Sequence, residues 1–324
     1  MLSPRVLVTG GRGFIGRAFL NALSSEVPLT SVVCLSRSSV ESHASAGPLY
    51  IVADLATGLN LPIDSADVVV HIAGEKRDVN RMRSVNTDGT NRMLSWSLDH
   101  GVKRFVFLSS VGVYGAKKNA GIVTELFTHA PVNEYERTKN EAERNVFHFC
   151  RTHGIECVIL QPSNVIGLHG ANDVLPLLGF MRSVSRRLLV QFGPSAWVNY
   201  VAVEDVGRAL VVASIDPGVN GTFILNEPLP LKDVVEVVAS QLSVRPPTRR
   251  VSLIVGLVLG ELGTLLERVF GRGVPINRDR VRELSNGTRY EGSKLVHATR
   301  FQYATGVRST LASMAAWYAG AEML

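Results

Sequence analysis

A tyrosine and a lysine four positions apart are the residues of this chain best suited to acid–base chemistry. Tyr135 and Lys139 fall in a predicted helix from about 135 to 153, where positions i and i+4 share a face. A phenol with an ordinary pKa of about 10 exchanges protons poorly at neutral pH. A neighbouring ammonium favours the phenolate and lowers that pKa. The pair predicts a proton-transfer site, and the alternative is an ordinary surface pair.

A serine completes this constellation. Ser110 follows the apolar run 105–108, which predicts a buried strand, and precedes the Tyr135 helix in the chain. Its hydroxyl can bond the same substrate oxygen as the tyrosine. A strand-end serine followed by this tyrosine–lysine pair is more specific than the pair alone.

The start of the chain carries a glycine-rich turn between a predicted strand at 5–8 and a predicted helix at 14–24. Glycines at 10, 13 and 16 allow a tight turn and let the backbone approach a pyrophosphate, which the helix N-terminus then favours. Because the turn opens a βαβ pattern, it predicts a dinucleotide site. The expected cofactor-binding residues here are Gly10, Arg12, Gly13, Phe14, Ile15 and Gly16.

The end of the second predicted strand (32–35) indicates which dinucleotide binds. An acidic residue about twenty positions after the turn would bond the ribose of NAD. This chain instead has Arg37 among serines, and its next acid is Glu41. Arg37, assisted by Arg12, suits a 2′-phosphate and favours NADP, with NAD as the alternative. Arg37 would otherwise be a solvated loop residue or stack on adenine.

The arrangement of predicted elements indicates the fold class. Continuous apolar strands alternate with helices through the first half of the chain, which is typical of a parallel sheet covered on both faces. We therefore expect an α/β, Rossmann-type doubly wound parallel sheet with a smaller, mostly helical C-terminal substrate region. Residues 1–166 would form the NAD(P)-binding domain and 167–324 the substrate region, with about 197–226 returning to the Rossmann sheet.

Composition excludes several classes of protein. The 324 residues are 46% hydrophobic and 19% charged, which excludes a disordered chain. The three cysteines and eight histidines show no metal-ligand spacing, so no metal is expected. The net charge of +6 is not clustered, so we expect no nucleic-acid partner, and an anionic substrate or anionic membrane surface remains. Neither a signal peptide nor a spanning segment is evident, and we expect a cytoplasmic protein.

Further motifs extend the pattern along nearly the whole chain: Asp54-Leu55, 71–74 (HIAG), 85–90 (VNTDGT) and 109–115 (SSVGVYG). With the glycine turn and the tyrosine–lysine pair, they make the chain similar to the extended short-chain dehydrogenase/reductase family of the NAD-dependent epimerase/dehydratase type. The resemblance implies Tyr135 as proton donor or acceptor and Lys139 as its pKa partner and ribose ligand. It also implies that Ser110 bonds the substrate oxygen, that Asp54 and Leu55 flank adenine, and that Ala73 lines the cofactor.

The segment 161–167 (QPSNVIG) resembles the Arg-Pro-x-Asn-Val-Tyr-Gly segment of nucleotide-sugar epimerases, dehydratases and reductases, which implies that Asn164 faces the substrate. Gln161 and Ile166 depart from that pattern. Val198 stands where many such enzymes have a diphosphate-binding arginine. Other arginines that can supply this charge are Arg182, Arg278 and Arg280.

The C-terminal region resembles bacterial surface-polysaccharide enzymes, which are 4-epimerases and 4-ketosugar reductases of N-acetylated sugars on UDP or polyprenyl diphosphate. With Arg37 this favours a reductase that delivers hydride to C4 of a nucleotide-linked sugar. The alternatives are a 4-epimerase with bound NAD, a 3β-hydroxysteroid-type dehydrogenase and a non-catalytic NADPH-binding scaffold. A dehydratase is disfavoured because residues 111–112 are Val-Gly, where such enzymes commonly carry Asp-Glu.

Two expectations concern partners. Residues 251–270 are apolar with few charges, which indicates a helix buried under the substrate region or an interfacial helix that touches the membrane surface. The family resemblance also implies a homodimer formed through the helices that flank Tyr135.

Overall fold

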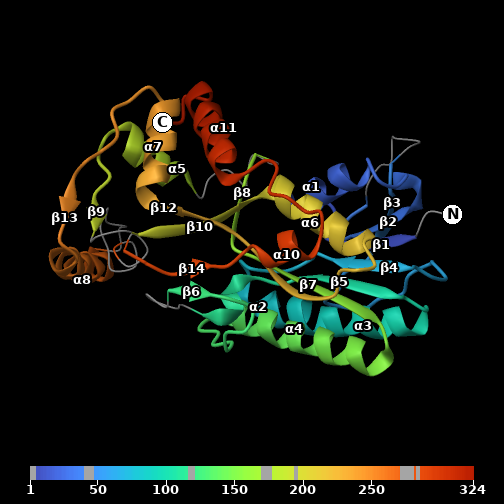
Figure 1. The fold of residues 1–324 in the computed structure, drawn as a ribbon. Coiled ribbons are helices and arrows are strands. Elements are labelled where there is room, and N and C mark those ends of the chain that lie inside the picture. The colour runs from blue at the N-terminus through green and yellow to red at the C-terminus, as the bar shows by residue number, and fades with distance from the viewer. Residues whose placement is uncertain are drawn as a thin grey trace.

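The core is a seven-stranded, wholly parallel sheet. The computed structural model describes residues 5–39, 47–115, 121–168, 177–192, 196–270, 281 and 285–324. The strand order across the sheet is β11-β7-β5-β4-β1-β2-β3 (Figure 1). The strands are β1 (Val6–Thr9), β2 (Val32–Ser36), β3 (Leu49–Val52), β4 (Val68–His71), β5 (Arg104–Leu108), β7 (Glu156–Pro162) and β11 (Gly221–Leu225).

Both faces of this sheet are buried, which explains why its central strands are continuously apolar. Alternate residues of each strand enter two different hydrophobic clusters: Val6 and Val8 of β1 join one, and Leu7 joins the other. In β5, Val106 faces the first cluster and Phe105 the second. This confirms the expected doubly wound Rossmann-type fold.

Helices cover the two faces. In Figure 1, α1 (Phe14–Leu23) and α6 (Val203–Ile215) lie above the sheet, while α3 (Gly89–Asp99) and α4 (Glu134–His153) lie below it. Gly207 lets α6 approach α1 closely, because an added Cβ there would lie 2.7 Å from the carbonyl of Ala18. A short helix α2 (Val79–Met82) and a π-helical turn η2 (Arg83–Asp88) lead into α3. The chain therefore enters α3 through a turn that is wider than that of an α-helix.

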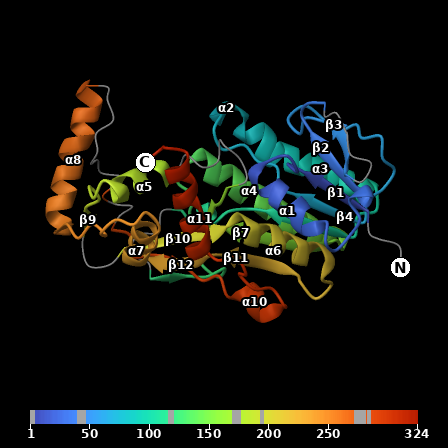
Figure 2. The same cartoon turned by 90° about the horizontal axis from the view of Figure 1, so that it is seen from above.

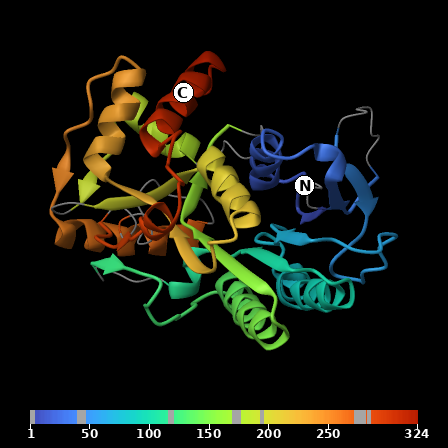
Figure 3. The same cartoon turned by 45° about the vertical axis from the view of Figure 1, so that its right-hand side comes forward.

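A second region gathers at the other end of the molecule, where the yellow, orange and red elements of Figure 3 lie opposite the blue N-terminal strands. Its core packs α5 (Leu178–Ser185), α7 (Leu231–Gln241) and α11 (Val307–Gly320) against a three-stranded sheet in the order β12-β10-β8. The remaining elements are η1 (Leu29–Ser31), η3 (Val111–Tyr114), β6 (Ile122–Val123), β8 (Asn164–Ile166), β9 (Gln191–Phe192), β10 (Trp197–Ala202), β12 (Glu227–Pro230), β13 (Arg250–Val251), α8 (Leu253–Phe270), β14 (Arg289–Tyr290) and α10 (Lys294–Ala298).

Two sequence expectations need correction. Of the segment 197–226, only β11 joins the large sheet, beside β7, whereas β10 pairs with β8 and β12. The helix expected within 251–270 forms as α8, but it is not buried under the substrate region, because six of its large apolar side chains are exposed. Within the described ranges, no helix is long and apolar enough to cross a membrane. Cys34, Cys150 and Cys157 are free, buried thiols.

Candidate active site

The glycine turn joins β1 to α1 at the carboxyl edge of the sheet. Gly10 has φ +73°, and an added Cβ would lie 2.8 Å from the backbone nitrogen of Ala73, so only glycine fits there. The Gly13 N–H donates to the Gly10 carbonyl over 2.9 Å and closes the turn. Gly16 packs against Gly10 and Gly11 so closely that a side chain would overlap their backbone.

The N-terminus of α1 is open to an anion. Its N-cap is Gly13, which provides no side-chain cap, and the first turn contains no acidic residue. The first N–H groups of a helix lack intrahelical acceptors, and the helix dipole favours negative charge there. The amides of Phe14 and Ile15 therefore fit a pyrophosphate, and the site as a whole fits a dinucleotide.

Arg12 reaches from this turn to the end of β2. Its guanidinium donates to the hydroxyls of Ser36 over 3.3 Å and Ser38 over 3.0 Å. Arg37 is exposed in the same loop. Two cations and two hydroxyls therefore surround the position where an acidic residue would bond the ribose of NAD. Glu41, the next acid in the chain, lies outside the described residues.

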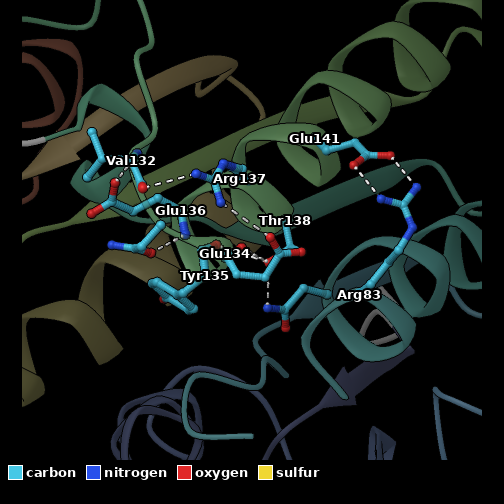
Figure 4. Close-up of polar contacts among 10 residues, drawn as sticks. Arg83, Val132, Glu134, Tyr135, Glu136, Arg137, Thr138 and Glu141 are labelled. Carbon is cyan, nitrogen blue, oxygen red and sulfur yellow. Dashed lines mark hydrogen bonds and ion pairs between the residues drawn. The ribbon is translucent and has the colours of Figure 1, made fainter. Parts of the chain in front are cut away.

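Local capping fixes the position of Tyr135. Asn133 caps α4 by accepting from the Glu136 N–H over 2.9 Å, and Glu136 accepts from the Val132 N–H over 2.7 Å (Figure 4). One turn further on, Arg83 of η2 binds Glu141 through two contacts of 3.3 and 3.1 Å. These contacts hold the first turns of α4, from which Tyr135 projects.

Ser110 and Tyr135 lie side by side at the end of β5, as the sequence spacing predicts. The Ser110 oxygen accepts from the Gly112 N–H over 3.1 Å, and the Ser110 hydroxyl lies close enough to Tyr135 to affect the pKa of the phenol. Burial raises the pKa of Tyr135, and the neighbouring Ser110 hydroxyl opposes that rise. Desolvation is the largest of these effects, and Lys139 is not among the groups that shift this pKa. A lowering of the Tyr135 pKa by Lys139 stays a prediction.

Lys139, one helical turn after Tyr135, is almost fully buried. Its Nζ donates to the carbonyl oxygen of Leu108 over 2.6 Å and lies 4.2 Å from the centre of the Phe107 ring. Burial lowers the pKa of the ammonium to about 7, and the nearby Glu143 carboxylate opposes that fall. At neutral pH the lysine is thus poised between its charged and neutral forms.

A buried polar network lies behind Lys139, and the sequence reasoning missed its centre, Glu143. The Glu143 carboxylate accepts from the Ser109 hydroxyl over 2.5 Å and from the Gln161 amide over 2.8 Å. Gln161 in turn accepts from the Tyr114 hydroxyl over 2.7 Å. The available signal was a glutamate four positions after Lys139, on the same face of α4. The network explains Gln161, which ties β7 to α4 and η3.

His71 and Asn86 are buried and hydrogen bonded within the protein. His71 is buried between the hydroxyls of Thr9 and Thr90, at 2.7 and 3.0 Å, and burial followed by the Lys139 charge lowers its pKa to about 3, so it is neutral. Asn86 accepts from the Glu75 N–H over 2.7 Å and donates to the Glu75 carbonyl over 2.8 Å. No cluster of side chains that could hold a metal occurs in the described part of the chain.

Of the other expected cofactor residues, Ala73 lies beside the glycine turn. The Ala73 N–H donates to the Thr9 hydroxyl over 3.1 Å, directly beside Gly10. Asp54 accepts from the Ala56 N–H and from Arg81, each over 2.9 Å. The Ala56 bond, followed by the charges of Arg81 and Arg37, lowers the Asp54 pKa. Leu55 is buried in the cluster under α3. A role for Asp54 and Leu55 beside adenine stays a prediction.

The expected substrate residues differ in their surroundings. Asn164 is exposed at the start of β8, opposite Tyr200 of β10. Val198 packs against the cluster of the second region, so the position of the absent arginine is apolar. Arg182 donates to the Met323 carbonyl over 2.6 Å, near the end of the chain. Arg278 and Arg280 lie outside the described residues.

Comparison with known proteins agrees with this geometry. Residues 6–222 match the model of the NAD dependent epimerase/dehydratase family. A UDP-glucose 4-epimerase of Vibrio cholerae is 31% identical over 239 residues, which cover 68% of this chain and 70% of the relative. An N-acetyl-alpha-D-glucosaminyl-diphospho-ditrans,octacis-undecaprenol 4-epimerase of Escherichia coli O157:H7 is 23% identical over 312 residues, or 93% of this chain and 91% of the relative.

The solved structure of a UDP-glucuronic acid 4-epimerase from Bacillus cereus in complex with NAD shares the fold. Its TM-score is 0.70 at 18% identity, with 98% of this chain and 99% of that chain covered. The family match spans the glycine turn, Ser110, Tyr135 and Lys139. The chain therefore belongs to the NAD-dependent epimerase/dehydratase family, within the extended short-chain dehydrogenase/reductase enzymes.

Proposed function

We propose that this enzyme transfers hydride at C4 of a nucleotide-linked sugar, with a UDP-linked N-acetylated sugar as the expected substrate. The observation that carries the proposal is the placement of Tyr135 beside Ser110 at the end of β5, with Lys139 buried one helical turn further along α4. This arrangement suits a substrate carbon whose oxygen gains or loses a proton as hydride moves. The intact triad argues against a non-catalytic scaffold.

Each residue has a defined task in this reaction. A bound nicotinamide cofactor supplies or accepts the hydride. In the reductive direction Tyr135 donates its phenolic proton to the C4 oxygen, and in the oxidative direction the phenolate takes that proton back. Ser110 donates a hydrogen bond to the same oxygen. Lys139, when protonated, stabilises the phenolate.

Epimerisation at C4 is the form of this reaction that the relatives favour. Both curated relatives named above are 4-epimerases, and one of them acts on a sugar linked to undecaprenyl diphosphate. In such a reaction the sugar is oxidised at C4 and then reduced on its other face, so the cofactor is regenerated in each turnover.

Reduction of a 4-ketosugar is the second candidate, and Arg12 favours it. Arg12 and Arg37 at the end of β2 suit a 2′-phosphate, and hence NADPH that exchanges after each turnover. Dehydration is disfavoured, because Gly112 has no side chain and the Glu136 carboxylate beside it accepts from the Val132 N–H.

The nucleotide that the purified holoenzyme releases on denaturation separates the two candidates. Stoichiometric NAD, identified by mass spectrometry, supports the epimerase, whereas an empty site or NADP supports the reductase. A thermal-shift series with UDP-sugars and a 3β-hydroxysterol tests the substrate class. Stabilisation by the sterol and not by any UDP-sugar would overturn the proposal.

Two finer expectations about partners and location also remain proposals. A homodimer through α3 and α4 is supported by the exposed apolar side chains Leu98 and Phe147, beside a shallow depression lined by both helices. A peripheral membrane contact through 251–270 is developed below.

A further inference from the structure

Helix α8 exposes the large apolar side chains that an ordinary surface helix would bury. Among the α8 residues whose burial is described, the buried ones are Gly256, Gly260 and Gly263. Its large apolar side chains point outward instead, with Ile254 76% exposed and Val258 57% exposed. An amphipathic helix of a soluble domain normally buries such side chains and exposes polar ones.

The exposed apolar residues share one face. At about 100° per residue, they span an arc of about 140°, and the three buried glycines lie on the other side of the helix. Glu261 lies at the edge of this face and is the one charged residue among the described side chains of α8. The exposed members are Ile254, Val255, Val258, Leu259, Leu262 and Leu265, named here the α8 apolar face.

This face lies at the periphery of the molecule. Figure 2 shows α8 at the end opposite β3, extending away from α5 and α7. None of the four hydrophobic clusters formed by the described residues includes a side chain of α8. A contiguous exposed apolar surface of this kind marks an interaction site.

Exposed arginines lie on the two chain segments that meet next to the start of α8. Arg245 and Arg249 lie on the segment that leads into β13 and α8. The parallel pairing of β13 with β9 brings a second segment beside β13, and the exposed Arg186 and Arg187 lie on that segment between α5 and β9. Leu188, beside them, is 59% exposed. The apolar face is thus accompanied by four cations.

An apolar face together with nearby cations indicates which kind of partner binds α8. An apolar helix face accompanied by cations fits an anionic lipid surface, where the side chains enter the acyl boundary and the arginines meet lipid phosphates. A second copy of the chain is a poorer fit, because a twofold contact through this face would offer the arginines only Glu261 as an acidic partner among the described side chains of α8. We propose that α8 docks this protein on anionic membranes, lying in the plane of the interface. This inference does not depend on the sugar chemistry proposed above.

The test is flotation of the full chain with vesicles of equimolar phosphatidylcholine and phosphatidylglycerol, compared with phosphatidylcholine alone. We expect binding to the anionic vesicles that weakens as salt is raised. Val258→Glu with Leu262→Glu should weaken it by about tenfold or more, since charged side chains do not enter the acyl boundary. Arg245→Glu with Arg249→Glu should remove most of the preference for the anionic lipid.

The matched control places two glutamates on exposed apolar positions elsewhere. Leu49 and Val52 of β3 are 56% and 60% exposed, at the other end of the molecule. Leu49→Glu with Val52→Glu should leave flotation unchanged, and thermal unfolding checks that every variant is folded. Flotation that survives the α8 substitutions, or wild-type protein that binds no vesicle, overturns the proposal. A dimer in light scattering that the α8 substitutions dissociate, without any flotation, would assign the face to a second copy.

Discussion

The Ser109 hydroxyl donates a hydrogen bond of 2.5 Å to the carboxylate of Glu143, which links the end of β5 to the face of α4 that carries Lys139. Ser109 immediately precedes Ser110, and Glu143 lies one helical turn beyond Lys139. The same carboxylate opposes the fall in the Lys139 pKa that burial causes. Glu143 is therefore placed to position the serine strand and to hold charge on the lysine.

Replacing Glu143 by glutamine should move the alkaline limb of the kcat–pH profile to lower pH. The carboxylate raises the pKa of Lys139, so its removal lets the ammonium lose its proton at lower pH. A neutral lysine no longer stabilises the Tyr135 phenolate, so turnover falls earlier as the pH rises. A pH series of kcat from about 6 to 10 measures this.

Glu141→Gln is the control for this substitution. Glu141 is on the same helix but pairs with Arg83 at the surface. Its variant should keep the wild-type profile. An unchanged alkaline limb in Glu143→Gln would show that this carboxylate does not influence the proton transfer.

Tyr135→Phe should reduce turnover by about a hundredfold or more and leave cofactor affinity nearly unchanged. The variant removes the hydroxyl that exchanges a proton with the substrate oxygen, while the glycine turn and Lys139 remain in place. Cofactor titration by fluorescence and steady-state kinetics on the same preparation measure both quantities. Substantial residual activity would refute the assignment of Tyr135.

The sequence predicts the Rossmann half of the chain well because its signals are local. The apolar run 105–108 lies within β5, and the tyrosine–lysine helix begins within one residue of its predicted start. Ser110 and Tyr135 meet because β5 and α4 are neighbours in a known topology. Their contact could therefore be inferred before the structure.

The sequence-based predictions differ from the structure where the deciding interaction joins residues that are far apart in the chain. An apolar run such as 197–201 predicts a strand but not its partners, so β10 was placed in the wrong sheet. The π-helical turn before α3 has no signature in a pattern read at 3.6 residues per turn. The orientation of α8 depends on inward-facing glycines. A prediction from the spacing of large apolar residues takes no account of glycines. Glu143 was missed because its partners Ser109 and Gln161 come from two other elements.

Replacing both Arg12 and Arg37 by alanine should weaken NADPH binding selectively. If the two guanidinium groups hold a 2′-phosphate, their loss removes charge-assisted hydrogen bonds worth about 1.5–3 kcal/mol each, which is at least about tenfold in Kd. NADH has no 2′-phosphate, so its Kd should change little. Isothermal titration with both cofactors measures the ratio. An equal loss of affinity for NADPH and NADH would show that these arginines do not bind the 2′-phosphate.

Gly16→Ala should impair both stability and cofactor binding, because the added Cβ would overlap the backbone of Gly10 and Gly11 in the phosphate-binding turn. Overpacking of this kind costs about 1–3 kcal/mol, and relief requires the turn to open. Gly179→Ala in α5 is the control, since nothing lies within 4 Å of the added Cβ and alanine favours a helix. Chemical unfolding and cofactor titration should show losses for Gly16→Ala alone. Unchanged stability in that variant would mean that the turn accommodates a side chain and is not the tight cradle described here.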